Sequence, residues 1–193
     1  GIHPENADEF NEDVVKEIKE FVKNEKVKAI GEIGLDYYWE ENPPREVQKE
    51  VFRAQMKLAD ELNLPVVIHD RDAHKDTLEI MKEFPNVIGV VHCFSGSVEL
   101  AKECIKLGYY IGFTGVLTFK NAKKLVDVCR EIPAERMLVE TDCPFMAPVP
   151  FRGKRNKSDY IEYIIDKMSE IRGISGEEMN EILLNNKKRL FKI

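Results

Sequence analysis

The sequence lacks any apolar run that approaches the roughly 18 residues needed to cross a membrane. It also lacks an excess of basic residues: the formal net charge of the 193-residue chain is -6, which argues against binding to polyanions through overall charge. A nucleic-acid substrate is still compatible with this composition, because metal ions and one basic loop can supply positive potential locally. With 43% hydrophobic residues, the chain can bury a substantial core, and we expect one domain over residues 1–193.

Paired cysteine spacing is absent as well. The four cysteines, Cys93, Cys104, Cys129 and Cys143, form no CxxC motif, and no secretory segment precedes them. This pattern is typical of a reduced protein, so we expect a cytoplasmic location and no disulfide framework. The chain begins at Gly1 and not at methionine, from which we expect that a preceding segment is missing.

Short apolar runs alternate with longer amphipathic segments along the whole chain. The apolar runs, expected to be strands, cover residues 27–34, 65–69, 87–94, 109–115 and 137–142. The amphipathic segments, expected to be helices, cover residues 8–24, 45–63, 76–84, 97–107, 121–132, 158–172 and 175–191. Strands that are apolar throughout and alternate with helices predict a parallel sheet covered by helices. The fold class predicted is therefore α/β, of the TIM-barrel type.

Four of the apolar runs end in residues that commonly bind metals: Glu32, His69, His92 and Asp142. A single histidine after an apolar run is more often a core residue than a ligand. Four such residues at four strand ends favour a shared site, because buried carboxylates are costly without a partner and α/β barrels place their chemistry at this face. Carboxylates with imidazoles suit Mg²⁺, Mn²⁺ or Zn²⁺, as in metallohydrolases.

A basic loop follows the last of these runs, in residues 137–156. It carries Arg152, Lys154 and Arg155 just after Asp142, an order that indicates a metal beside an anionic substrate. The alternative is that these cations form an ordinary solvated charge run. Cys93 and Cys143 each follow a candidate ligand directly, and because neighbours on a strand point in opposite directions, we expect both cysteines in the core.

Seven segments of the chain are distinctive: GIHP (1–4), IGEIGLDYYW (30–39), VIHDR (67–71), HCFSG (92–96), IGFTG (111–115), ETDCP (140–144) and APVPFRGKRN (147–156). Together they resemble the segments of the TatD family of metal-dependent deoxyribonucleases. The resemblance implies an amidohydrolase-like TIM barrel with two divalent metal ions, acting on DNA that is single-stranded or bound at its ends.

The same resemblance implies roles for individual residues. Glu32 would bridge the metals, His69 and His92 would ligate one of them, and Asp142 would bind metal and accept a proton from water, so Asp142 and Glu32 are the candidate catalytic residues. The substrate-binding candidates that it implies are His3, Arg152, Lys154, Arg155 and Asn156. We also expect a monomer that does not associate with membranes.

One family feature is missing from this sequence. The family opens with a strand that carries a His-x-His pair, which supplies ligands to the other metal, and no such pair occurs here. A typical barrel needs about 250 residues. We therefore interpret the chain as the C-terminal three-quarters of a barrel that is incomplete at its N-terminal side, with the first metal site incomplete.

Three functions stay open at this point. The first is a metal-dependent exonuclease that cleaves phosphodiester bonds of DNA, which the basic loop favours. The second is an amide or ester hydrolase, because the same barrel and ligands can activate water against carbonyls. The third is a catalytically impaired fragment that only binds nucleic acid or a partner chain, which the missing His-x-His pair favours.

Overall fold

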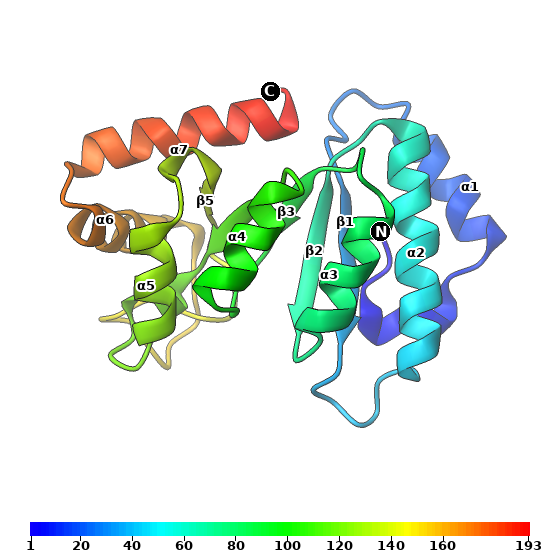
Figure 1. Ribbon diagram of the computed structural model, residues 1–193, viewed down its shortest axis with the longest axis horizontal. Helices are drawn as coiled ribbons and strands as arrows, with labels where there is room; N and C mark the ends of the chain where they lie inside the picture. Colours follow the sequence, from blue (N-terminus) through cyan, green and yellow to red (C-terminus); the bar gives the residue numbers. More distant parts are fainter. The chain divides into compact units, whose positions relative to one another are not determined.

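The computed structural model describes residues 1–193, which divide into two compact units. The N-terminal unit comprises Gly1–Val91 and Leu107–Tyr109, together with Lys192. The C-terminal unit comprises His92–Lys106 and Tyr110–Phe191, together with Ile193. Figure 1 colours the chain from blue to red, so that the N-terminal unit is mainly blue to green and the C-terminal unit green to red. No helix in either unit is long and apolar enough to span a membrane.

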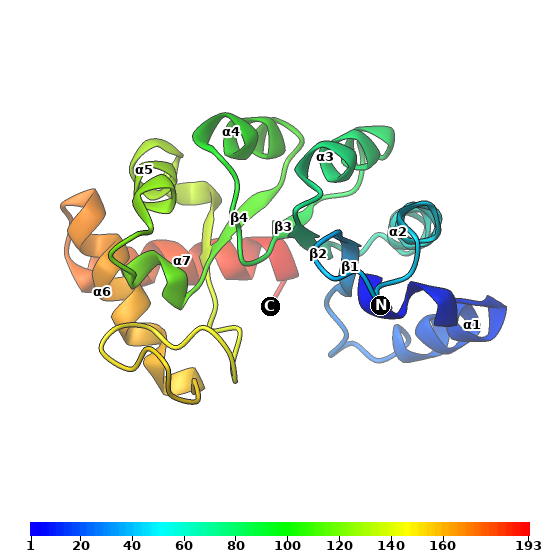
Figure 2. The same cartoon turned by 90° about the horizontal axis from the view of Figure 1, so that it is seen from below.

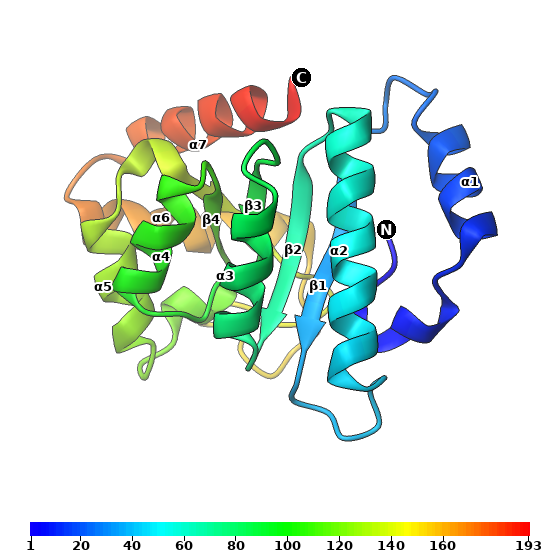
Figure 3. The same ribbon diagram turned by 45° about the vertical axis from the view of Figure 1, so that its right-hand side comes forward.

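The N-terminal unit is a small parallel sheet with helices beside it (Figure 3). Its elements in chain order are η1 (Pro4–Glu9), α1 (Glu12–Phe21), β1 (Ile30–Asp36), α2 (Arg45–Leu62), β2 (Val66–Arg71), α3 (His74–Glu83) and β3 (Gly89–Val91). Strand β2 pairs in parallel with β1 on one side and with β3 on the other. Helix α2 packs against β1, and α3 packs against β2. This arrangement confirms the predicted alternation of parallel strands and helices.

The longest helix shows why these packing contacts form. Phe52, Met56 and Ala59 of α2 recur at helical spacing and are fully buried, so one stripe of the helix faces the core. On the strands, Ile33 and Ile68 are also fully buried. Because burial of each large apolar side chain contributes about 1.5–3 kcal/mol, this interface holds the two candidate ligand strands, β1 and β2, in place.

The C-terminal unit contains a parallel strand pair and the last four helices (Figures 1 and 2). Its elements are α4 (Val98–Lys106), β4 (Tyr110–Phe113), η2 (Gly115–Thr118), α5 (Lys123–Glu131), η3 (Ala134–Arg136), β5 (Met137–Val139), η4 (Ser158–Tyr160), α6 (Ile161–Arg172) and α7 (Gly176–Phe191). Helix α7 packs against β5. Buried Asn186 of α7 donates hydrogen bonds of 2.8 Å to the carbonyls of Ala134 and Met137, which fixes the start of β5.

All five predicted strands and all seven predicted helices are present, but the strand ends were placed wrongly. Strand β1 does not stop at Gly34; it continues to Asp36, and β2 continues to Arg71. Glu32 and His69 therefore lie inside their strands and not at the ends. Gly34 has a φ of 138°, and a Cβ there would lie 2.0 Å from the carbonyl oxygen of His69. The glycine thus permits a close approach of two strands within the sheet, and it does not mark a turn.

The strand that precedes the basic loop is shorter than predicted. Strand β5 ends at Val139, so Glu140 and Asp142 lie in the segment that follows. Asp142 has a φ of 52°, in the left-handed region, where a strand cannot continue. His92, by contrast, follows β3 directly, as predicted.

Candidate metal site

Three ligand-type side chains converge in the N-terminal unit: His3, Glu32 of β1 and His69 of β2. Their donor atoms all lie within 4.8 Å of one another. Oε2 of Glu32 is 3.9 Å from Nε2 of His3 and 3.8 Å from Nδ1 of His69, and the two imidazole ring centroids are 4.4 Å apart. Ligands that each bind one ion at about 2.1 Å are separated by about 3.4 Å in a tetrahedral site. The three donor atoms therefore need to move only slightly to become ligands of one divalent cation.

The protonation of His3 suits this interpretation. Burial lowers the pKa of His3 below its ordinary value, and the nearby His69 lowers it further, whereas Glu5, Glu32 and Asp36 oppose the shift. A histidine binds metal only in its neutral form. The lowered pKa keeps the imidazole of His3 neutral, and able to bind a metal ion, at a lower pH than an exposed histidine would allow. We predicted His3 as a substrate-binding residue; the structure places it instead beside Glu32 and His69.

A fully buried carboxylate, Asp36, orients one of these histidines. Its Oδ2 lies 2.9 Å from Nε2 of His69, so Nδ1 is the nitrogen that faces Glu32. A carboxylate on the far nitrogen of an imidazole ligand fixes its orientation and raises its basicity. Gln48 of α2 holds the Asp36 backbone from both sides, accepting from its N–H at 2.8 Å and donating to its carbonyl at 3.0 Å.

Asp36 was not predicted as a site residue, although the sequence contains a usable signal for it. Asp36 is the first carboxylate after Ile33 and Leu35, whose alternation marks the buried part of the strand. The end of β1 was placed at Gly34, so Asp36 was assigned to the following loop, where an aspartate is ordinarily solvated.

The C-terminal unit brings together His92 and Glu140. Nδ1 of His92 lies 3.1 Å from Oε2 of Glu140, and the other carboxylate oxygen of Glu140 accepts a 2.7 Å hydrogen bond from the backbone N–H of Cys93. His92 is buried and Glu140 half-buried. Glu140 thus holds His92 as Asp36 holds His69, a role that the sequence analysis did not assign. A single centre containing Glu32, His69, His92 and Asp142 stays a prediction, because the two histidines belong to separate units.

The segment after β5 is organised by Asn156. Its buried side-chain amide donates to the carbonyl of Thr141 at 2.7 Å and to that of Phe145 at 2.6 Å. Its backbone N–H donates to the carbonyl of Pro144 at 3.0 Å. We predicted Asn156 as a substrate-binding residue, but its amide is directed at the loop that carries Asp142. We therefore assign it to positioning that loop.

The basic side chains of the loop are exposed, which fits both contact with an anion and a solvated charge run, so their role in substrate binding stays a prediction. Arg152, Lys154 and Arg155 all lie at the surface. The guanidinium of Arg152 lies over the ring of Phe119, with 4.2 Å between its Cζ and the ring centroid. Phe119 also lines a cavity of about 450 Å³, whose charged lining residues are Lys120, Lys123, Asp127, Arg130 and Lys167. This part of the C-terminal unit is positively charged although the whole chain is acidic.

The cysteine predictions were partly wrong. None of the four cysteines is in a disulfide. Cys104 and Cys129 are buried, and burial raises the pKa of the Cys129 thiol to about 12, which keeps it protonated. Cys143, however, is exposed and Cys93 half-buried. Both lie beyond the ends of their strands, which are Val91 and Val139, so the alternation of side chains that placed them in the core does not apply.

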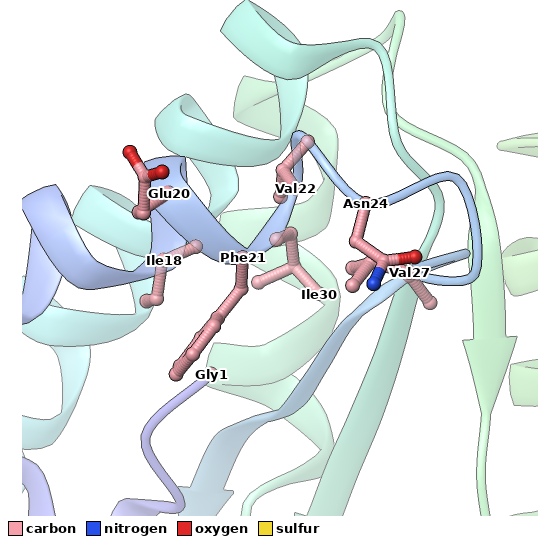
Figure 4. Close-up of a pocket in the computed structure, with 9 residues that line it drawn as sticks. Gly1, Ile18, Glu20, Phe21, Val22, Asn24, Val27 and Ile30 are labelled. Atoms are coloured by element: carbon pink, nitrogen blue, oxygen red, sulfur yellow. The ribbon is translucent and has the colours of Figure 1, made fainter.

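A second cavity, of about 430 Å³, lies in the N-terminal unit away from the histidines (Figure 4). Its walls are mainly apolar and include Ile18, Phe21, Val27 and Ile30. Figure 4 shows the Phe21 ring extending toward Gly1 and the carboxylate of Glu20 turned away from it. No cluster of metal-ligand side chains lines this cavity, so its size alone does not make it a reaction site.

Parallel strands that alternate with helices, with imidazole and carboxylate donors on adjacent strands, define an α/β protein of the metallohydrolase barrel type. The model of the family "TatD related DNase" matches residues 1–192, and the chain belongs to this family. A relative from Bacillus subtilis strain 168, named as the uncharacterized metal-dependent hydrolase YabD, is 50% identical over the whole chain, which covers 76% of that protein. The "3'-5' ssDNA/RNA exonuclease TatD" of Pectobacterium parmentieri is 34% identical over the whole chain, which covers 76% of it.

Solved structures agree with this assignment. The crystal structure of YjjV, a TatD homologue from Escherichia coli K12, superimposes on this chain with a TM-score of 0.92 at 33% identity, covering all of this chain and 75% of that one. A TatD-family hydrolase from Entamoeba histolytica gives a TM-score of 0.87 at 28% identity and covers 99% of this chain. These likenesses confirm the predicted fold class. The chain spans about three quarters of the length of these relatives.

Proposed function

We propose that this chain supplies the catalytic residues of a divalent-metal-dependent hydrolase that cleaves phosphodiester bonds at the ends of single-stranded DNA. The observation that carries the proposal is the cluster of His3, Glu32 and His69, with Asp36 behind it. When bound there, a divalent ion supplies Lewis-acid activation of the phosphoryl group and a water nucleophile at neutral pH. Membership of the TatD-related DNase family supports the choice of bond.

In this proposal the protein's own groups divide the work. His3, Glu32 and His69 would hold the ion, and Asp36 keeps Nδ1 of His69 on the side of Glu32. Asp142, which the family resemblance makes the candidate base, would accept a proton from water. The exposed cations Arg152, Lys154 and Arg155 contact the phosphate backbone, which compensates locally for the net charge of -6.

The test is hydrolysis of an end-labelled single-stranded oligonucleotide with added Mg²⁺, Mn²⁺ or Zn²⁺, with an N-acyl amide offered in parallel. We expect stepwise shortening of the oligonucleotide, which stops when a chelator is added. Asp142→Asn should lower kcat by at least about 100-fold, the lower limit for loss of a general base. Turnover of the amide alone, or binding of the strand without any cleavage, would overturn the proposal.

The cations of the loop are tested by the salt dependence of binding. Each phosphate contact to a single strand contributes about 0.7 to the slope of log K against log salt. Replacing Arg152 and Arg155 by alanine should raise KM, flatten the salt slope by about 1.4 and change kcat less. The matched control is Lys187→Ala with Lys188→Ala, two exposed lysines on α7, for which we expect no change of slope.

A further inference from the structure

Two aromatic side chains stand exposed in the loop that leaves β1. Tyr38 retains 51% and Trp39 44% of its accessible surface. Their ring centroids lie 4.7 Å apart with the ring planes nearly perpendicular. The guanidinium of Arg71, the last residue of β2, lies over both rings, with its Cζ 3.9 Å from the Tyr38 centroid and 5.4 Å from that of Trp39. We refer to Tyr38, Trp39 and Arg71 as the aromatic platform.

The platform is held by backbone hydrogen bonds. The backbone N–H of Tyr37 donates to the carbonyl of Arg71 at 2.9 Å, which continues the pairing of β1 with β2 by one residue. The N–H of Tyr38 donates to Oδ1 of Asp36 at 3.0 Å, and the amide of Asn42 donates to the carbonyl of Asp36 at 3.2 Å. The rings are therefore presented by a loop of defined conformation.

The same buried carboxylate links the platform to the candidate metal site. Asp36 uses Oδ1 for the Tyr38 backbone and Oδ2 for Nε2 of His69. In the sheet, Asp36 pairs with Arg71 and Gly34 pairs with His69. Arg71 of the platform thus lies two residues beyond the ligand histidine on β2. Tyr38 and Trp39 follow the paired end of β1, where they can contact a substrate held at the cluster.

The exposure of these rings needs an explanation, because large aromatic side chains gain free energy by burial. Aromatic rings on which bases stack, combined with arginine, form the usual binding surface for single-stranded nucleic acid, and stacking is worth about 1–3 kcal/mol for each base. Glu40 and Glu41 follow in the same loop, so attraction of phosphates alone does not account for this surface. A planar, uncharged group is the ligand that it fits.

We propose that the aromatic platform stacks a nucleobase of the single strand whose backbone is cleaved at the adjacent cluster. The proposal rests on the proposed function and specifies its substrate: a strand with an unpaired base next to the scissile phosphate. A duplex, whose bases are already stacked on one another, cannot offer such a base without first unpairing. The expected preference is therefore for single strands and frayed ends.

Trp39 provides a direct readout, because it is the only tryptophan in the chain. The fluorescence of the 193-residue protein is titrated with an oligothymidylate, and in parallel with an abasic strand of equal length and charge, without added metal so that neither strand is cut. Stacking should quench the fluorescence with the oligothymidylate and not with the abasic strand. Equal quenching by both strands, or by neither, would contradict the proposal.

Variants separate stacking from a structural effect. Trp39→Ala should raise the Kd for the oligothymidylate by about 5-fold to 150-fold, the range expected for one stacked base, and Trp39→Phe should restore most of the affinity. The matched control is Phe21→Ala, which removes another exposed ring of the same unit, and it should leave Kd unchanged. A Trp39→Ala variant that binds like this control would overturn the proposal.

The two proposals fail in different ways. If the chain does not cleave phosphodiesters, the wild-type protein gives no shortened oligonucleotide with any of the metals, whatever the fluorescence shows. If only the stacking is wrong, the wild-type protein still shortens the strand. Trp39→Ala then has the same KM as wild type for single strands, and the same KM as wild type for duplex.

Discussion

The two units hold their histidines in the same way but present their carboxylates differently. In the N-terminal unit Glu32 and Asp36 both lie on β1, and the backbone pairing of β1 with β2 sets their distance from His69. In the C-terminal unit Glu140 and Asp142 lie beyond the end of β5, and hydrogen bonds from Asn156 support their segment. A site on paired strands is fixed by the fold, whereas a site on a loop depends on a few side chains. The predictions below test this difference.

The largest effect is expected for Glu32→Gln. This change removes the carboxylate that faces both imidazoles. Mutating a residue that only supports a metal ligand lowers affinity or activity by up to about 100-fold. Because Glu32 is itself a candidate ligand, metal affinity and turnover should each fall by more than about 100-fold. Calorimetric titration with Mn²⁺ measures the affinity. The control is Glu5→Gln, an exposed carboxylate 3.7 Å from Nδ1 of His3, which should lower metal affinity far less.

A smaller effect is expected for Asp36→Asn. The amide keeps the shape but loses the charge that orients His69, and metal affinity should fall by about 10-fold to 100-fold. Because Asp36 also holds the backbone of Tyr38, the variant should also show a weaker Trp39 fluorescence response in the titration with oligothymidylate. Loss of metal affinity with an unaltered fluorescence response would show that the platform is positioned independently of Asp36.

Asn156→Ala tests the loop-borne site. Removal of the Asn156 side-chain amide leaves the carbonyls of Thr141 and Phe145 without their donor, which should cost about 1–3 kcal/mol of folding free energy. We expect faster proteolysis within residues 140–156 and a lower kcat, with metal binding at His3, Glu32 and His69 unchanged. Asn185→Ala, at an exposed asparagine of α7, serves as the control. If both variants resist the protease equally, Asn156 does not support the loop.

The smallest effect is expected for Tyr37→Phe, which lies outside both sites. The Tyr37 hydroxyl donates a 2.8 Å hydrogen bond to Asp76, an interaction that lowers the pKa of Asp76 from its ordinary 3.8. Burial, aided by the same bond, raises the pKa of Tyr37 above its ordinary 10.0. The difference in unfolding free energy between wild type and variant should be about 1 kcal/mol at pH 7.

The pH dependence of that difference follows from the two signs. A lowered carboxyl pKa stabilises the fold above pH 3.8, and this contribution disappears as pH falls through the folded-state value. A raised phenol pKa stabilises the fold below pH 10.0, and this contribution declines as the pH rises further. Urea unfolding at pH 3, 7 and 11 should therefore show the largest difference at pH 7. A difference that is constant across this range would contradict the assignment.

The sequence by itself determined the order of strands and helices and the residue types of the site. Alternation of apolar runs with amphipathic segments is a local property, set by side-chain spacing along the chain. For the same reason His92 was correctly placed directly after its strand, and the segments that carry the family resemblance could be recognised from residues 1 to 156 without any structure.

Only the tertiary structure decided which of these residues meet. The neighbour of Glu32 is His3, whose segment is held by hydrogen bonds between the Ile2 backbone and Gln55 of α2. The partner of His69 is Asp36, because the register of β1 against β2 sets that distance. That register depends on the close approach at Gly34, where the strand continues although its sequence resembles a strand end. Pairing energy and burial of Leu35 outweigh the local preference of glycine for a turn. Which residues become neighbours across a sheet depends on long-range strand pairing, and this pairing cannot be predicted from the spacing of residues along the chain.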